Sequence, residues 1–223
     1  MALVDARYPH LFWDLDGTLT DPKEGITRSV QHALARLGIP VDDPDVLTPF
    51  IGPPLSTSFR DLYGLTPAQT EQAVQFYRER FDAQGIFENR VYPGIPELLQ
   101  DLAERGVVMA VATSKPTAAA ERILVHFGLR GRFEAVYGAG IADGWEKRDV
   151  LARAAADLSP RARRETAMIG DHPLDMSAAH AFGLPAVAAL YGYGDSARML
   201  AEHPEHTARD IEELRGVLLP REA

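Results

Sequence analysis

The chain has 223 residues and a hydrophobic content of 46%, enough for one large domain or a core with a modest insertion. Its formal net charge of −9 argues against a nucleic-acid polymer or an acidic membrane as the main partner, but not against a small phosphorylated substrate. The sequence has no cysteine, which excludes disulfides and thiolate chemistry; it shows neither a signal-like leader nor an apolar run of membrane-spanning length, so a cytoplasmic location is expected.

The first predicted element is a buried strand that ends in two acidic residues. An apolar run at 11–13 leads directly into Asp14, Asp16 and Gly17. Carboxylates that follow a strand of an open parallel sheet lie where such sheets bind their ligands. The pair suits divalent-metal binding and a division of roles between nucleophile and acid/base. The alternative is an acidic β-turn, because Asp and Gly are common turn residues.

The stretch 21–90 is predicted to form a small all-helical unit, inserted after the first strand. Apolar residues at helical spacing predict a helix over 26–37. A turn and a short helix through Phe59 follow, and a further helix is expected from Pro67 with Thr66 as its N-cap. The apolar stripe of that helix is predicted to comprise Val74, Tyr77 and Phe81. No strand is expected in this stretch.

After residue 91 the sequence alternates between predicted strands and predicted helices. Strands are expected over 107–112, 134–137, 166–169 and 185–190, and helices over 96–105, 117–127, 148–158, 174–182 and 211–219. This alternation predicts an α/β fold with a doubly wound parallel sheet. The domain organisation expected is a core of residues 1–20 and 91–223 with an inserted helical domain of residues 21–90.

Polar and charged residues of possible function also occur after a later strand and in a predicted loop. Thr113 and Ser114 end the strand 107–112 and could bind a phosphoryl oxygen, although either could simply cap the next helix. Lys147, expected in a loop, could neutralise a phosphate and a nucleophilic aspartate, although most lysines are solvated surface residues and Arg148 is a rival.

The last polar stretch contains Asp171 and, four residues later, Asp175. It follows the strand 166–169, so Asp171 is expected at the same sheet edge as Asp14. Carboxylates together with a backbone carbonyl form an oxygen-rich shell of the kind that Mg²⁺ prefers. The alternative is an ordinary helix entry with Pro173 in the first turn.

These stretches together resemble the haloacid-dehalogenase (HAD) superfamily, from Leu11 to about Leu218. The carrying motifs are DLDGTLT from Asp14, TSKP from Thr113, a D-G-x-x-K variant from Asp143 to Lys147, and GDxxxD from Gly170 to Asp175. The resemblance implies a Rossmann-like core with a helical C1 cap. Segments including TSKP and Tyr191-Gly192-Tyr193-Gly194 are similar to the phosphoglycolate-phosphatase and 5′-nucleotidase-like branch.

The resemblance also implies roles for individual residues. Asp14 is expected to be the nucleophile and Asp16 the general acid/base, with a Mg²⁺ cofactor held by the Asp14 carboxylate, the Asp16 carbonyl and Asp171. Thr113, Ser114 and Lys147 would bind phosphate, and Asp175 would orient waters or Lys147. The candidate cap contacts for the leaving group are Lys23, Gly52, Pro53, Arg60 and Arg80. Gly52, Pro53 and Pro54 could equally form a rigid turn between helices.

The resulting hypothesis is a Mg-dependent phosphatase of a small phosphorylated metabolite, acting through an aspartyl-phosphate. A dehalogenase is disfavoured, because that reaction does not use the second aspartate that Asp16 provides. A phosphomutase of the β-phosphoglucomutase type shares the motifs and the cap. A catalytically silent phosphate-binding module is a further alternative, disfavoured because Asp14, Asp16 and Asp171 are all present.

Overall fold

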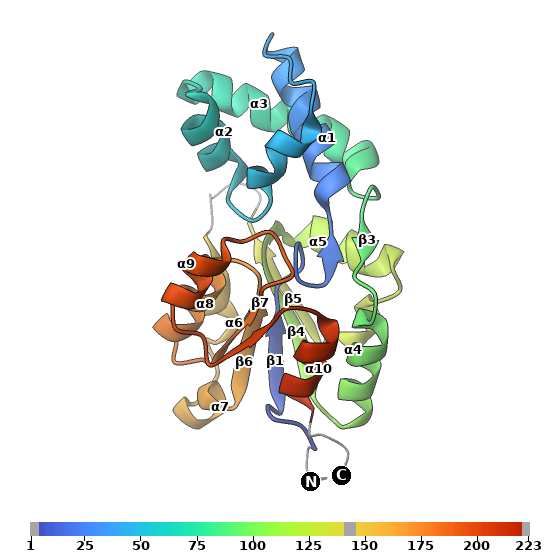
Figure 1. Cartoon of the computed structure of the whole chain (residues 1–223), viewed down its shortest axis with the longest axis vertical. Coiled ribbons are helices and arrows are strands. Elements are labelled where there is room, and N and C mark those ends of the chain that lie inside the picture. The colour runs from blue at the N-terminus through green and yellow to red at the C-terminus, as the bar shows by residue number, and fades with distance from the viewer. Residues whose placement is uncertain (1–4, 141–145, 220–223) are drawn as a thin grey trace. The chain divides into compact units, whose positions relative to one another are not determined.

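The computed structural model describes residues 5–140 and 146–219. The chain divides into two compact units, one made of residues 1–20 and 91–223 and the other of residues 21–90 (Figure 1). The function of the smaller unit as a cap stays a prediction. Among the described residues, no helix is both long and apolar enough to cross a membrane.

A six-stranded parallel sheet forms the centre of the larger unit. Its order is β5-β4-β1-β6-β7-β8, and every neighbouring pair runs parallel. The strands are β1 His10–Trp13, β4 Val108–Pro116, β5 Ala135–Ala139, β6 Thr166–Gly170, β7 Ala186–Ala189 and β8 His206–Ala208. The predicted doubly wound parallel sheet is therefore confirmed. The structure adds β8, which the sequence reading missed, and extends β4 through the TSKP segment.

Helices cover both faces of this sheet. They are α4 Ile95–Glu104, α5 Thr117–His126, α6 Lys147–Ala154, α7 Pro160–Arg164, α8 Pro173–Ala181, α9 Ser196–Ala201 and α10 Ile211–Leu218, with a 3-10 turn at Arg130–Arg132. A buried cluster joins one sheet face to α6, α8 and α9, whereas α4 and α10 lie on the opposite side (Figure 1). The short helices α7 and α9 were not predicted.

The strand register places the predicted functional residues at one edge of the sheet. Trp13 pairs with Val111 of β4 and with Ile169 of β6. The residues that follow these three positions therefore emerge at the same level, and the Asp14 N–H donates to the Ile169 carbonyl over 2.8 Å. The carboxyl ends of β1, β4 and β6 thus form a common platform for polar side chains.

The smaller unit is built mainly from helices. They are α1 Lys23–Arg36, α2 Leu55–Tyr63 and α3 Pro67–Arg80, with a 3-10 helix at Pro44–Phe50 and a π-helical turn at Phe81–Gly85. The expectation of no strand was wrong at the two ends, because β2 (Thr20–Asp21) pairs with β3 (Arg90–Val91). The predicted N-cap residue of helix α3 is confirmed, since Thr66 Oγ1 accepts the Gln69 N–H. Ala73 rather than Val74 is buried on that helix.

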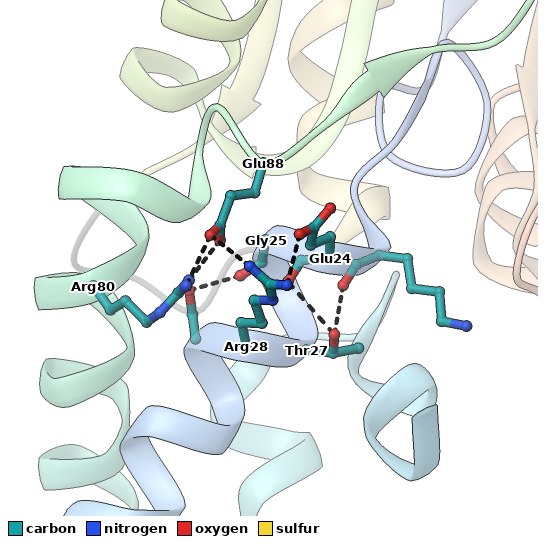
Figure 2. A network of polar contacts seen from close by, with 8 residues as sticks. Glu24, Gly25, Thr27, Arg28, Arg80 and Glu88 are labelled. Atoms are coloured by element: carbon teal, nitrogen blue, oxygen red, sulfur yellow. Dashed lines mark hydrogen bonds and ion pairs between the residues drawn. The ribbon is translucent and has the colours of Figure 1, made fainter. Parts of the chain in front are cut away.

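A polar network ties together three segments of the smaller unit (Figure 2). Arg80, at the end of α3, donates two hydrogen bonds to the Glu88 carboxylate over 2.7 and 2.9 Å. Arg28 of α1 reaches the same carboxylate over 3.3 Å, and the Gly25 N–H donates to the Glu88 carbonyl over 2.9 Å. The hydrogen bond from Arg80 lowers the pKa of Glu88, so the carboxylate stays ionised within the network.

The network closes only because Gly25 has no side chain. A Cβ at this position would overlap the carbonyl oxygen of Gly85, which belongs to the π-helical turn. Gly216, in α10, makes a suitable comparison because a Cβ there would meet nothing within 4 Å. Both glycines lie inside helices, where alanine has the higher intrinsic helix propensity.

We expect opposite effects from alanine at these two helical glycines. Gly25→Ala should lower the free energy of unfolding by about 2 kcal/mol or more, because the new Cβ forces backbone apart. Gly216→Ala should raise it by about 0.5–1 kcal/mol through helix propensity alone. Thermal and urea unfolding followed by circular dichroism measure both changes. A Gly25→Ala protein as stable as the wild type would contradict the close packing of α1 against the turn.

Candidate active site

Three carboxylates and one ammonium group meet at the carboxyl edge of the sheet. Carboxylate oxygens of Asp14, Asp171 and Asp175 lie within 4.8 Å of one another, and all three residues are buried. Lys147 Nζ lies 2.8 Å from Asp14 Oδ1 and 2.7 Å from Asp175 Oδ1. The structure therefore brings together four of the residues that the sequence singled out.

Lys147 begins helix α6 and does not lie in a loop, so that part of the prediction was wrong. Glu146 precedes it as the N-cap, and the Lys147 side chain is only 4% exposed. Its Nζ also donates to the Ala112 carbonyl over 3.0 Å. Burial by itself would lower the pKa of Lys147, but the charges of Asp14 and Asp175 outweigh it and raise that pKa well above its usual value. Asp143 and Gly144 of the predicted motif lie outside the described residues.

Asp175 is held in place by the first turn of its own helix. The His172 N–H donates to Asp175 Oδ2 over 3.0 Å, and His172 Nδ1 accepts the Leu174 N–H at the start of α8. A Cβ on Gly170 would overlap the Asp175 carboxylate, which explains the glycine of the GDxxxD motif. Burial raises the pKa of Asp175 to about 6 even beside Lys147.

Asp171 is enclosed by two loops. Its carboxylate accepts the Thr18 hydroxyl over 3.1 Å and the Tyr193 N–H over 2.8 Å. Gly192 and Gly194 approach it so closely that a Cβ on either would overlap Asp171 atoms. Sequence reasoning took the Tyr191–Gly194 run as a subfamily mark and missed this contact. The alternation of Tyr and Gly was the available signal, because such glycines permit close approach.

Asp16 stands apart from the carboxylate cluster. Its Oδ2 lies 2.8 Å from Lys115 Nζ, and the two side chains are 14% and 7% exposed. Burial raises the pKa of Asp16, with Lys115 opposing the rise and the charge of Asp14 adding to it. Gly17 follows with a φ of +80°, and a Cβ there would overlap the Asp171 carboxylate. The turn at Asp16 therefore depends on glycine.

Thr113 and Ser114 lie in β4 itself, beyond the predicted end of that strand. Thr113 is buried, and its Oγ1 accepts the Lys115 N–H over 3.3 Å. Ser114 is partly buried. The pairing of β4 with β5 shifts register between Thr113 and Pro116, which marks a bulge at the site edge. Binding of phosphate by these two hydroxyl residues stays a prediction.

The cluster has the chemistry of a divalent-cation site. Three carboxylates face one lysine, which leaves excess negative charge in a buried space. Asp14 Oδ1 and Asp175 Oδ1 lie at ion-pair distance from Lys147, yet among the described residues neither accepts a directed hydrogen bond. Buried oxygens of this kind gain most from a cation that prefers oxygen ligands, as Mg²⁺ does. The residues therefore fit a magnesium ion.

Known proteins resemble this chain along most of its length. Residues 11–189 match the haloacid dehalogenase-like hydrolase family. A 5′-nucleotidase of Pseudomonas aeruginosa is 46% identical over 214 residues, covering 95% of this chain and 96% of that protein. The crystal structure of a predicted phosphatase from Clostridium acetobutylicum shares 38% identity at a TM-score of 0.88, covering 94% of this chain and 97% of the other.

A third relative has a different name. A tyrosine-protein kinase of Mycobacterium tuberculosis is 43% identical over 186 residues. The match covers 82% of this chain but 62% of that kinase, so the chain spans less than two thirds of its length.

The chain belongs to the haloacid dehalogenase-like hydrolase family. The predicted family and its parallel α/β core are confirmed by the sequence match and by the structural neighbour. The predicted class of enzyme, a phosphatase-type hydrolase of this family, is confirmed by the same comparisons.

We expect the stability of the metal-free protein to fall as pH rises. Burial and the neighbouring carboxylates raise the pKa of Asp171 to about 8, whereas an unfolded aspartate titrates near about 4. A raised carboxyl pKa favours folding below the unfolded value, and that contribution is lost as pH rises through the folded value. The melting temperature in EDTA should therefore decline between about pH 5 and pH 8.

Added Mg²⁺ should raise the melting temperature more at the upper end of this pH range, because the ionised carboxylates bind it. Asp171→Asn keeps the side-chain shape but lacks the titrating group, so its profile should be flatter and its response to Mg²⁺ smaller. Differential scanning fluorimetry of both proteins measures this. If Mg²⁺ raised the melting temperature of the two proteins equally at both ends of this pH range, Asp171 would not be a ligand.

Proposed function

We propose that this chain is a Mg-dependent phosphomonoester hydrolase, which acts on a small phosphorylated metabolite through an aspartyl-phosphate. The observation that carries the proposal is the buried cluster of Asp14, Asp171 and Asp175 around Lys147. It gathers a nucleophile, metal-binding oxygens and a cation at the edge where parallel sheets bind ligands.

Asp14 is the proposed nucleophile. Lys147 Nζ, 2.8 Å from Asp14 Oδ1, offsets negative charge as a phosphoryl group approaches the carboxylate. Thr113, Ser114 and backbone N–H groups at the start of α5 would bind the other phosphoryl oxygens. Asp175, 2.7 Å from the same Nζ, fixes where that ammonium group lies.

Asp16 is the proposed acid and base. It gives a proton to the leaving oxygen when the phosphoester bond breaks, and it takes one from the water that hydrolyses the aspartyl-phosphate. The role requires a carboxyl group that can hold a proton near neutral pH. Burial, which raises the pKa of Asp16, favours that state.

Three groups would hold the metal: the carboxylates of Asp14 and Asp171 and the backbone carbonyl of Asp16. When bound, Mg²⁺ supplies positive charge that offsets the charge of the phosphoryl group and the carboxylates. Thr18 and the Tyr193 N–H keep Asp171 oriented towards this role through the hydrogen bonds already described.

A nucleoside 5′-monophosphate is the proposed substrate class, with phosphoglycolate as the other class within the branch. The 5′-nucleotidase of Pseudomonas aeruginosa supports the first, because its similarity extends over nearly the whole of both chains. The unit 21–90 would act as the cap that selects the leaving group. Among its candidate contacts, Arg80 is held by Glu88, Lys23 pairs with Asp45, and Arg60 pairs with Asp61.

A second candidate function is phosphoryl transfer to a tyrosine side chain. The relative named a tyrosine-protein kinase is 43% identical over 186 residues, which favours testing this reaction. In both reactions Asp14 could attack phosphorus, and the difference lies in whether water or a phenolic hydroxyl accepts the group. A phosphomutase would differ in the same step, with a sugar hydroxyl as acceptor.

The first test is phosphate release from a panel of monoesters. It comprises nucleoside 5′-monophosphates, phosphoglycolate, sugar phosphates and p-nitrophenyl phosphate, each with Mg²⁺ or EDTA. We expect release that requires Mg²⁺ and is lost in Asp14→Asn. Asp16→Asn should keep Asp14 intact but lower kcat by about 10²–10⁴-fold, because both proton transfers are lost.

Two further arms separate the alternatives. Incubation with γ-labelled ATP and a tyrosine-containing peptide would detect a kinase, and isomer analysis of sugar phosphates would detect a mutase. A folded protein that binds Mg²⁺ but releases no phosphate from any ester would overturn the hydrolase proposal. Release that persists in Asp14→Asn would overturn the assignment of the nucleophile.

A further inference from the structure

Lys115 is the second buried lysine of the site, and neither the sequence reading nor the proposed mechanism gives it a role. Its Nζ lies 2.8 Å from Asp16 Oδ2, and its side chain is 7% exposed. The sequence has three lysines, Lys23, Lys115 and Lys147, among its 23 basic residues. Two of the three are thus buried at this sheet edge in a chain that otherwise uses arginine, which suggests that a compact ammonium group is needed there.

The backbone around Lys115 is shaped by a bulge. The register of β4 against β5 shifts between Thr113 and Pro116, and bulges of this kind re-aim side chains beside active sites. Gly138 of β5 packs directly against this bulge, since a Cβ there would lie 2.6 Å from the Lys115 carbonyl oxygen. The Lys115 N–H is in turn bonded to Thr113 Oγ1 over 3.3 Å. The direction of the lysine is therefore built into the strand pair.

The two carboxylate oxygens of Asp16 have different surroundings. Lys115 binds Oδ2, whereas Oδ1 is buried and accepts no hydrogen bond from the described residues. A buried ion pair contributes little net stability, because desolvation of both charges offsets their attraction. Neutralising Asp16 is therefore a weak reason to bury a lysine here. Fixing the rotation of a carboxyl group that must transfer protons is a stronger one.

We propose that Lys115 is a positioning residue that holds Asp16 by Oδ2, so that Oδ1 exchanges the proton with the leaving-group oxygen. The inference rests on the proposed phosphatase function. In the first step a bond forms between Asp14 and phosphorus, the ester P–O bond breaks, and the leaving oxygen takes the proton of Asp16 Oδ1. In the second step Oδ1 takes a proton from water as the water oxygen displaces Asp14 from phosphorus.

The dependence of the rate on the leaving group distinguishes a positioning role of Lys115 from a merely structural one. p-Nitrophenolate leaves readily without a proton, whereas phenolate depends much more on protonation, and the two esters have nearly the same shape. The ratio of kcat/KM for p-nitrophenyl phosphate to that for phenyl phosphate therefore reports how well Asp16 delivers its proton. Because kcat/KM covers only steps up to the first irreversible one, later hydrolysis of the aspartyl-phosphate does not affect it.

The experiment measures this ratio for the wild type, Lys115→Met, Lys115→Arg and Asp16→Asn, all with Mg²⁺. We expect Lys115→Met to raise the ratio by about 10-fold or more, in the same direction as Asp16→Asn. Lys115→Arg, which keeps a cation, should return the ratio part of the way to the wild-type value. Arg130→Met removes an ion pair to Glu121 outside the site and should leave the ratio unchanged.

Gly138→Ala is the second variant, and it keeps the charge of Lys115. Its new Cβ should displace the bulge and raise the ratio in the same direction, while the circular-dichroism spectrum stays native. A Lys115→Met protein that loses activity equally on both esters, or loses only affinity, would overturn the positioning role, and so would a Gly138→Ala protein with an unchanged ratio. A wild type inactive on every ester overturns the proposed function and this inference with it.

Discussion

The ion pairs of Lys147 are the interaction on which the site depends. Its Nζ contacts Asp14 and Asp175 while being almost fully buried. Carboxylates that are gathered without solvent repel one another and become hard to ionise, which is why burial and mutual charge raise the pKa of Asp171 to about 8. Lys147 offsets negative charge at Asp14 and Asp175, and a divalent cation would offset the charge that remains on the cluster.

Glycines make this gathering sterically possible. Gly17 and Gly192 pack against Asp171, and Gly170 packs against Asp175, each so closely that a Cβ would overlap the aspartate. The backbone therefore fills the volume that water would otherwise take beside the carboxylates. Exclusion of water strengthens the field of Lys147 at Asp14, where the proposed reaction develops charge. The same packing raises the cost of leaving the carboxylates without a cation.

Much of this arrangement could be predicted from the sequence, because local patterns specify strand ends. Asp14 and Asp171 follow short apolar runs, and the parallel register then brings them to one edge. Lys147 was expected in a loop because the predicted helix began at Arg148. The structure starts α6 one residue earlier, after Glu146, whose N–H donates to Asp149 Oδ2 over 3.0 Å. Strand β8 and helices α7 and α9 are too short to show a clear period.

Contacts between segments far apart in the sequence cannot be predicted from such local patterns. Lys115 approaches Asp16 from the segment where the register of β4 shifts, and a Cβ on Gly138 of β5 would overlap the backbone there. A single sequence does not encode which glycine faces which bulge, since that pairing depends on the assembled sheet. In the proposed mechanism the two lysines have different tasks, because Lys147 contacts Asp14 and Asp175, whereas Lys115 contacts Asp16, the proposed acid and base. Lys147 lies at ion-pair distance from the proposed nucleophile, whereas Lys115 contacts Oδ2 of Asp16 and leaves Oδ1, which accepts no hydrogen bond from the described residues, as the oxygen that would exchange the proton.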